Sequence, residues 1–339
     1  MGISSSLGSS ALLPAGLGFR NVLINGDFSV WQRGTSITVT TGSPYTADRW
    51  CVTPGGAANF SASRQTASLD GFQYCLRFQR TASNTNTSAL YLSQPVETVN
   101  SVPVANKQVS FSFYARAGAN FSAASSALNV RIVTGTGTDG NYLAATLTGQ
   151  AFQLDTTATL TTSWQRFTYS VLIPSGVNQV QPVFFYTPVG TAGAADYFEI
   201  TGVQLEQNLQ PTPFEQRPIG VELALCQRYY EKSYENATAP GTATYTRLVT
   251  MTGSAGSATT GEIIGNYYWA AVKRVAPTVS WYDHNGNSNR VTRLQYGVAN
   301  HGNNVAAAGT VTERMAVVSS TSGNTGQSLQ FHFVADVEL

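Results

Sequence analysis

The chain has 339 residues, of which only 11% are charged, and 19 Lys and Arg against 18 Asp and Glu leave a formal net charge of +1. This charge provides no electrostatic footprint for nucleic acid or anionic lipid, so we expect no nucleic-acid partner. No run of about 18 apolar residues is present, so we expect no membrane insertion either. The low charge and the abundant Gly, Ser and Thr are more typical of β-rich surface and virion proteins than of cytosolic enzymes.

Residues 1–20 consist mainly of Gly, Ser, Ala and Leu. Such a segment cannot bury enough apolar surface to form a core by itself. We therefore expect an N-terminal docking arm that is held against another subunit or another protein. The full length of 339 residues suggests two domains or three, at about 100–200 residues for each domain.

Residues 21–213 carry the pattern of short strands separated by turns. Apolar Val109, Phe111 and Phe113 alternate with Ser110 and Ser112, which is the signature of a half-buried antiparallel strand. Turn signals such as Asp-Gly and Pro-Ser-Gly fall between the strand-like stretches. Many short strands at this spacing predict an all-β fold, with a jelly-roll β-sandwich over this region.

Residues 214–235 form a different kind of segment, a proline-rich linker followed by PIGVELALCQRYYEKSY. Helical spacing of the apolar residues predicts a helix over 219–233, with Val221, Leu225 and Tyr229 as its apolar stripe. The stripe has two alternative places, the sheet of its own domain or a contact between copies at a three-fold axis, and we favour the second. Residues 236–339 return to strand patterns and predict a second, smaller β-sandwich.

Motifs for catalysis are lacking in this sequence. Its three histidines show no metal-ligand spacing, and it has neither a nucleophile elbow nor a phosphate-binding loop. Three cysteines without C-x-x-C spacing are expected to be buried thiols. We therefore expect a protein that is not an enzyme and that has no catalytic residues.

The stretch WYDHNGNSNR is the candidate ligand site. It gathers aromatic, acidic, His and Asn side chains at a strand end, and sugars are bound by ring stacking combined with such hydrogen-bonding groups. A polar hairpin loop with a packed Trp is the alternative. The candidate glycan residues are Trp281, Tyr282, Asp283, His284, Asn285 and Asn287.

The segment NGDFSVW resembles the start of jelly-roll carbohydrate-binding modules. That resemblance implies a structural calcium ion held by an early acidic residue and a late Asp, for which Asp27 and Asp196 are the matching positions. Ser29 stands where a second acidic residue is expected, which weakens the ligand set because calcium takes six to eight oxygens.

The segments NVLINGDFSVWQRGTS, YTADRW, FSFYARAG and GVQLEQNLQPTPFEQRPIGVELALCQRYYEKSY resemble a family of bacteriophage tail-fibre and virion surface proteins, over about residues 18–235. The resemblance implies a non-catalytic homotrimer in the virion, assembled in the host cytoplasm. In this reading residues 1–20 bind other virion proteins and residues 236–339 face a host surface glycan. The alternatives are a capsid decoration protein and a glycan-active enzyme module.

Overall fold

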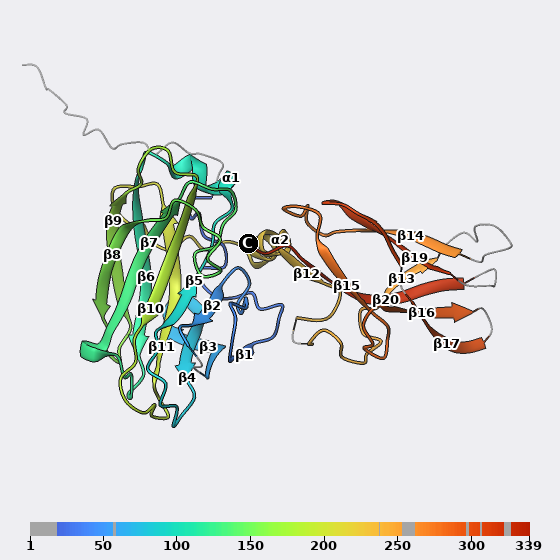
Figure 1. Cartoon of the computed structure of the whole chain (residues 1–339), viewed down its shortest axis with the longest axis horizontal. Helices are drawn as coiled ribbons and strands as arrows, with labels where there is room; N and C mark the ends of the chain where they lie inside the picture. The colour runs from blue at the N-terminus through green and yellow to red at the C-terminus, as the bar shows by residue number, and fades with distance from the viewer. Residues whose placement is uncertain are drawn as a thin grey trace, which may run out of the picture.

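The computed structural model describes residues 19–56, 59–236, 238–252, 262–295, 298–305, 307–321 and 327–339. The described chain is nearly all β, which confirms the predicted fold class. Two bodies of antiparallel sheet lie end to end, and the short helix α2 (Ile219–Gln227) stands between them (Figure 1). The predicted docking arm lies almost entirely outside the described residues.

The first body is a two-sheet sandwich. Its six-stranded sheet has the order β1 (Ser36–Val39), β3 (Phe60–Leu69), β4 (Phe72–Arg80), β11 (Tyr197–Glu206), β6 (Gln108–Ala117) and β9 (Gln165–Leu172). Its five-stranded sheet has the order β2 (Cys51–Pro54), β5 (Leu90–Ser93), β10 (Gln179–Tyr186), β7 (Ala127–Gly135) and β8 (Ala151–Thr159). Short helical turns are α1 (Thr98–Ser101), η1 (Val102–Val104) and η2 (Ala124–Ser126).

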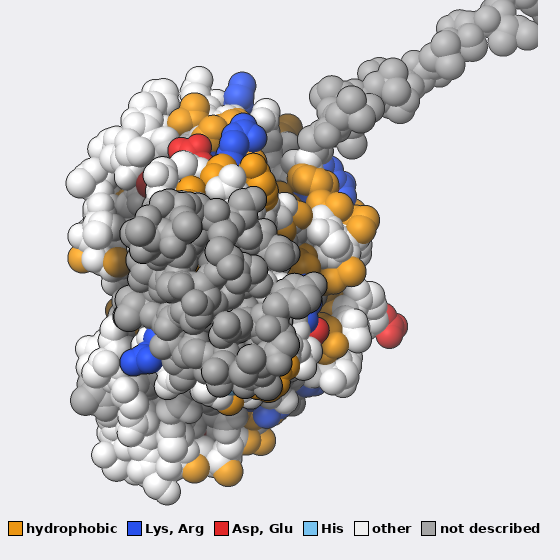
Figure 2. Space-filling model, turned by 90° about the vertical axis from the view of Figure 1, so that its right-hand side faces the viewer, with side chains coloured by type: hydrophobic (Ala, Val, Ile, Leu, Met, Phe, Trp, Pro, Cys, Tyr) orange, Lys and Arg blue, Asp and Glu red, His pale blue; other side chains and the backbone are white. Residues whose placement is uncertain are grey.

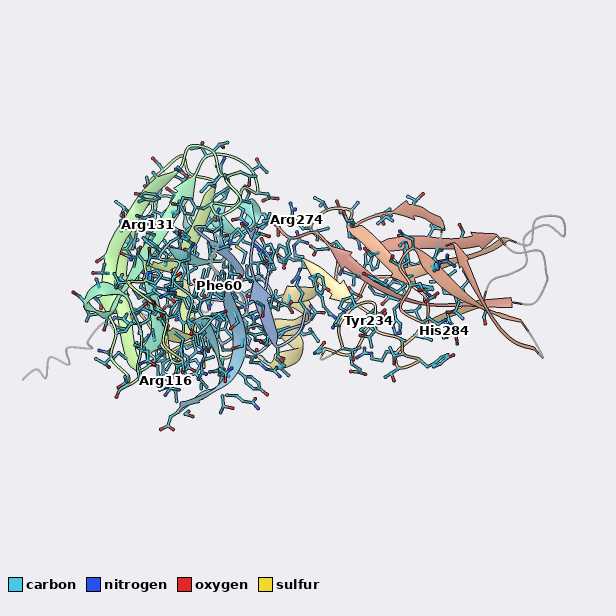
Figure 3. The ribbon with its side chains drawn as sticks, turned by 60° about the horizontal axis from the view of Figure 1, so that its bottom comes forward. Phe60, Arg116, Arg131, Tyr234, Arg274 and His284 are labelled. Carbon is cyan, nitrogen blue, oxygen red and sulfur yellow. The ribbon has the colours of Figure 1, made fainter. Side chains whose placement is uncertain are left out.

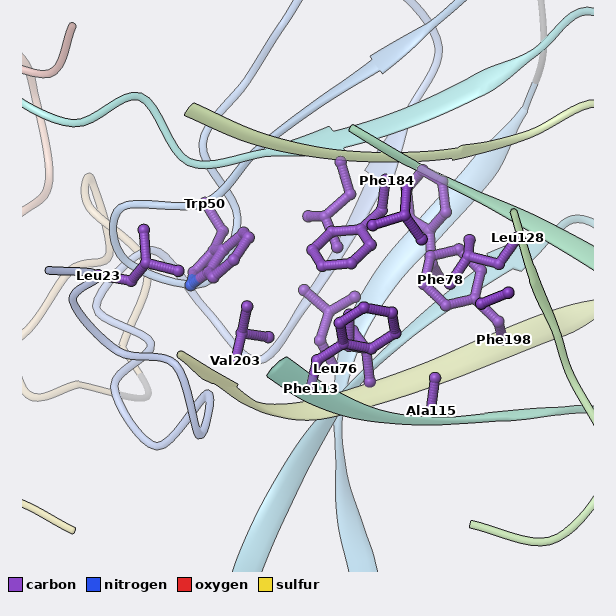
Figure 4. Packing of buried hydrophobic residues seen from close by; sticks show 14 of the residues in the cluster. Leu23, Trp50, Leu76, Phe78, Phe113, Ala115, Leu128, Phe184, Phe198 and Val203 are labelled. Atoms are coloured by element: carbon purple, nitrogen blue, oxygen red, sulfur yellow. The ribbon is translucent and has the colours of Figure 1, made fainter. Parts of the chain in front are cut away.

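The core of this sandwich lies between the two sheets (Figure 4). Phe111 and Phe113 of β6 are fully buried, as the alternation predicts, but Ser110 and Ser112 are also buried, so the prediction of a half-buried strand is wrong here. Phe113 meets Phe184 of the opposite sheet edge to face, with ring centroids 4.9 Å apart. At one end of the core Trp50 packs on Phe28, with ring centroids 5.0 Å apart. Edge-to-face aromatic pairs of this kind add packing specificity to the burial of apolar area.

The junction helix is shorter than the sequence predicts. It ends at Gln227, and residues Tyr230–Lys232 form strand β12 instead of a further helical turn. Strand β12 pairs with β20 (Gln327–Asp336), with Tyr230 opposite Asp336. The prediction of a helix to residue 233 is therefore wrong, because pairing with a strand a hundred residues away overrides local helical spacing.

The second body is built around β20. Its first sheet has the order β12, β20, β16 (Arg290–Gln295) and β17 (Val298–Val305), with β13 (Val249–Thr252) and β15 (Thr278–Tyr282) also paired to β20. A three-stranded sheet has the order β14 (Glu262–Tyr268), β19 (Met315–Thr321) and β18 (Ala307–Val311). Among the described residues no helix is both long and apolar enough to span a bilayer.

Buried charges join the two bodies. Arg49 of the first body is 1% exposed and forms an ion pair with Glu338 near the end of the chain. Arg228, at the end of α2 and 32% exposed, donates to Glu97 of the first body at 2.7 Å and so ties the helix to that body. Buried ionic groups of this kind need their partners to offset the cost of desolvation. The relative position of the two bodies is therefore fixed by specific contacts.

Candidate functional site

The candidate glycan residues on the second body do not form an exposed aromatic surface on which a sugar could stack. Trp281 is only 3% exposed, and its ring packs edge to face on Phe331 at 5.2 Å and on Phe333 at 6.3 Å. Tyr282 packs on Tyr234 at 6.0 Å. The Trp ring belongs to the core of the second body, so its assignment as a ligand-stacking residue is wrong.

The polar residues of the same stretch hold a turn. The Asp283 carboxylate is fully buried and accepts hydrogen bonds from the backbone N–H groups of Asn285 and Asn287, each at 2.9 Å. His284 is bound through Nδ1 to the Thr292 hydroxyl at 2.6 Å and lies on the second body, away from the sandwich core of the first (Figure 3). Of the six candidate glycan residues, Asn285 and Asn287 are exposed. The alternative of a polar hairpin loop describes this stretch better.

The two predicted calcium ligands are not brought together. Asp196 immediately precedes β11, whereas the Asp27 carbonyl contacts the Thr201 hydroxyl five residues further along, at 3.5 Å. At about 3.3 Å for each residue of a strand, the two positions are roughly 16 Å apart. No group of three or more His, Cys, Asp or Glu among the described residues could hold a metal ion. The prediction of a calcium ion shared by Asp27 and Asp196 is therefore wrong.

Asp196 has a different partner. The carboxylate is fully buried and pairs with the Arg80 Nη1 at 2.9 Å. The Nη2 of the same guanidinium donates to the carbonyls of Asn84, Asn86 and Gly190, at 2.8, 2.8 and 3.1 Å. A guanidinium thus occupies a cage of carboxylate and carbonyl oxygens, which is the donor set that hard cations prefer.

The predicted apolar stripe of the junction helix is divided in the structure. Tyr229 is fully buried, lies beyond the helix end and donates its hydroxyl to Glu97 at 2.7 Å. Burial raises the pKa of Tyr229 to about 12, with the neighbouring Glu97 charge adding to the rise. Leu225 is half-buried against the cluster that contains Ile24. Tyr229 is therefore an intrachain residue, and its assignment to an intermolecular contact is wrong.

A cleft beside Asp27 is the strongest candidate site on the described surface. It lies mainly on the first body beside the start of α2, with Asn236 from the segment after β12, and has a volume of about 460 Å³. This volume lies within the range that ligand-binding clefts occupy. Its lining residues are Asp27, Ser29, Val30, Arg64, Gly71, Gln73, Tyr74, Gln216, Arg217, Ile219, Leu223 and Asn236. We call it the Asp27 cleft.

The local sequence explains how Asp27 reaches the cleft. Its neighbour Gly26 passes so close to β11 that an added Cβ would lie 2.2 Å from the Val203 carbonyl oxygen, which excludes any larger residue. Asn25 and Phe28 both have positive φ, near 56° and 55°. The chain therefore makes a tight turn that presents Asp27, and the Ser29 hydroxyl holds the carboxylate with a hydrogen bond of 2.9 Å.

Strands β3 and β4 provide another wall of the Asp27 cleft. The Arg64 guanidinium lies over the Tyr74 ring, 4.4 Å from its centroid, which orients both groups by a cation–π contact. Between the strands, Gly71 turns the chain with φ of 83°. The Gln216 side-chain amide donates to the Gly71 carbonyl at 2.8 Å and so closes the wall with the linker.

Charged groups behind the Asp27 cleft come from the linker and the helix. Arg217 contacts Glu222 of α2 at 3.4 Å. Burial raises the pKa of Glu222, and the charge of Arg217 opposes that rise. Glu222 also accepts a hydrogen bond from the backbone N–H of Asn25. The helix thus anchors the turn that carries Asp27, the one residue of the cleft that the sequence analysis named as a candidate ligand-binding residue.

The arrangement in the Asp27 cleft combines several kinds of hydrogen-bonding group. The Asp27 carboxylate accepts hydrogen bonds, the Arg64 guanidinium donates them, and the side-chain amides of Gln73 and Asn236 can do both. Tyr74 adds an aromatic ring. Neither Arg64 nor the amide residues belong to any motif, because they come from separate strands and loops, and no signal in the sequence could have identified them together.

Comparison with known proteins gives matches among solved structures. No protein-family model matches the sequence, and no curated protein matches it either. A CBM4 structure is 18% identical with a TM-score of 0.34, over 54% of this chain and 98% of that one. A CBM22-1 xylan-binding domain from Paenibacillus barcinonensis is 10% identical with a TM-score of 0.32, over 57% and 96%.

A third similar structure is the enzymatically active domain of tailspike protein 4 of bacteriophage CBA120. It is 11% identical with a TM-score of 0.33, and the match covers 56% of this chain but 21% of the tailspike chain. This chain therefore spans about a fifth of the tailspike structure that it matches. All three similarities concern about half of the present chain, and none of them decides its ligand.

Proposed function

We propose that the chain is a non-catalytic glycan-binding protein and that the Asp27 cleft holds the saccharide. The observation that carries the proposal is the composition of the cleft, where a carboxylate, a guanidinium, side-chain amides and a tyrosine ring converge. Hydroxyl groups of a sugar both donate and accept, and they are matched by a mixed set of this kind. The proposed ligand site is therefore not the stretch around Trp281 that the sequence analysis favoured, but a cleft formed mainly by the first body.

The acid–base chemistry of the cleft supports binding in preference to hydrolysis. Asp27 is the one carboxylate among the described residues that line it. Glycoside hydrolysis ordinarily uses two carboxyl groups on opposite sides of the scissile bond. A single carboxylate can hold a sugar hydroxyl but cannot supply both an acid and a nucleophile or base.

A virion location is the finer part of the proposal, and it rests on the sequence resemblance to phage tail-fibre proteins. In this proposal the chain is a homotrimer that attaches the virion to host glycan, with residues 1–20 docked on another virion protein. Exposed apolar side chains support such contacts, since Phe19, Val102 and Leu209 are 55%, 49% and 67% exposed. Figure 2 shows hydrophobic side chains exposed on the side from which the second body projects.

Binding of the intact chain to a glycan array, followed by titration of each hit, tests the proposal. Weak binding at each site is expected to increase when several copies are presented together. Asp27→Ala should weaken binding about tenfold or more, because a charge-assisted hydrogen bond is lost. Asp155→Ala is the control, since this carboxylate is also partly exposed but pairs with Arg131 on the other sheet.

Two outcomes would overturn the proposal. One is an array on which the multimerised intact chain binds no glycan. The other is that no glycan found on the array binds more weakly to Asp27→Ala than to the wild type. Localisation on intact virions tests the finer part, since sites on the head lattice would favour a decoration protein.

A further inference from the structure

A row of side chains crosses the outer face of the six-stranded sheet, away from the Asp27 cleft. The register places Ser63 of β3 opposite Arg77 of β4, Arg77 opposite Glu199 of β11, and Glu199 opposite Arg116 of β6. Paired residues on neighbouring strands share one face of a sheet. Their sequence neighbours, such as Phe78, Phe198 and Ala115, face the core. We call Arg77, Glu199 and Arg116 the arginine row.

The arginine row has two cations for one anion. Arg77 donates from Nε and Nη2 to Glu199 Oε1, at 2.8 and 2.6 Å. Arg116 donates from Nε to Glu199 Oε2 at 2.6 Å. The Glu199 side chain is 0% exposed, whereas those of Arg77 and Arg116 are 26% and 25% exposed. The carboxylate is therefore neutralised from both sides, and one positive charge remains at the surface.

Donor groups also remain unused in the arginine row. Neither Nη1 of Arg77 nor the two Nη groups of Arg116 has a hydrogen-bond partner among the described residues. The contrast is Arg131 on the five-stranded sheet, which donates to both oxygens of Asp155, at 2.9 and 3.2 Å. That pair is neutral, one cation to one anion. Neutralising Glu199 would need only one arginine, so the second is available to an external anion.

Aromatic rings fix both arginines from the side. The Arg116 guanidinium lies 4.8 Å from the Trp164 ring centroid, and the Arg77 guanidinium lies 4.1 Å from that of Tyr197. The Trp164 indole is itself held, because its Nε1 donates to the Ala67 carbonyl at 2.7 Å. A guanidinium held by stacking loses less rotational freedom when it binds a carboxylate.

We propose that the arginine row is a second binding site, which takes a saccharide that carries a carboxylate. The planar N–H fork of arginine matches a carboxylate in a bidentate geometry. Trp164 and Tyr197 provide apolar surface on either side for the sugar rings. The site is independent of the Asp27 cleft, and it does not depend on whether the cleft binds a glycan.

Titration of the intact chain with trigalacturonate, compared with its fully methyl-esterified form, tests this site. The two ligands share the same sugar rings and differ in the carboxylate charge. Trigalacturonate should bind with an affinity that falls as salt is raised, and the ester should bind about tenfold or more weakly. Arg116→Gln should cause a similar loss, while Arg131→Gln on the opposite sheet should cause none (Figure 3).

Three further variants control for a change of fold, for binding in the cleft and for the source of the fluorescence signal. Arg116→Lys keeps the charge but loses the fork, so partial loss of affinity with an unchanged melting temperature supports bidentate recognition. Asp27→Ala should leave the binding of trigalacturonate unchanged, which separates this site from the cleft. Trp164→Phe should abolish any change in tryptophan fluorescence that the ligand produces.

The proposal is overturned if the acid and its ester bind equally, because the carboxylate is then not recognised. It is overturned equally if Arg116→Gln and Arg131→Gln have the same effect, since the binding then follows net charge alone. Competition with inorganic phosphate is the remaining test. If phosphate displaces trigalacturonate as effectively as free trigalacturonate does, the row is a simple oxyanion site and the saccharide proposal fails.

Discussion

Arg80 and Asp196 form a fully buried ion pair at 2.9 Å, with both side chains 0% exposed. The guanidinium lies beside Asp196, one of the two residues predicted to hold calcium, and it is surrounded by that carboxylate, three carbonyls and the Ser122 hydroxyl at 3.2 Å. A residue supplied by strand β4 thus performs the structural role that a cation would perform. The loop around Asn84 and the loop around Gly190 are tied together by this one side chain.

Removing this cation should leave a buried, uncompensated carboxylate. We expect Arg80→Ala to lower the free energy of unfolding by about 3–5 kcal/mol. Because the oxygen cage remains, millimolar calcium should raise the melting temperature of Arg80→Ala but not that of the wild type. Arg77→Ala is the control, since Glu199 keeps Arg116 as a partner. A calcium-insensitive Arg80→Ala would show that the cage does not accept an ion.

The Arg49–Glu338 pair should make the two bodies unfold together. Glu338→Gln leaves Arg49 buried without its carboxylate partner, at a cost of about 3–5 kcal/mol. Calorimetry should show one transition for the wild type and two for Glu338→Gln. Arg247→Gln breaks an exposed pair, with side chains 59% and 52% exposed, and should change stability by less than about 1 kcal/mol. Two transitions in the wild type would contradict this coupling.

Lys232 should give the protein an unusual alkaline response. Burial lowers the pKa of Lys232 to about 8, below its usual value of 10.5, and the charge of Asp48 opposes the fall. Between pH 8 and pH 10.5 Lys232 is therefore protonated in the unfolded chain but largely neutral in the folded chain. The unfolded chain binds more protons in this window, so the free energy of unfolding should rise as the pH increases through it. Melting temperatures at pH 8 and pH 10 should differ less in Lys232→Met than in the wild type. An equal difference in both would exclude Lys232 as the cause.

The position of Leu225 allows a test of assembly. If the helix also serves a contact between copies, Leu225→Glu should lower the solution mass, measured by light scattering, before either sandwich unfolds. Tyr229→Phe is the matched variant, since it removes only the hydroxyl that donates to Glu97. That variant should lose about 1–3 kcal/mol of stability without any change in mass. Simultaneous unfolding of Leu225→Glu with no monomer would place its role within the chain, against Ile24.

Local patterns predicted what depends on local chemistry. The alternation of Phe111 and Phe113 with serines is enough to define a strand face, because side chains alternate strictly across a sheet. The turn at Asp70-Gly71 was likewise predicted from its Asp-Gly sequence. In the structure Gly71 has a φ of 83°, a backbone conformation that favours glycine. The surface assignment of Trp281 was wrong, because the polar loop beside it does not reveal which face of β15 its side chain occupies.

The all-β class and the change of character near residue 218 could be predicted from the sequence, since they follow from periodicity, turn chemistry and charge. The tertiary structure was needed to show that Arg80 pairs with Asp196, that Tyr229 is internal, and that Arg77 and Arg116 meet on Glu199. The physical reason is register. Residues more than eighty positions apart become neighbours only when antiparallel strands pair, and the identity of the partner is not contained in either segment.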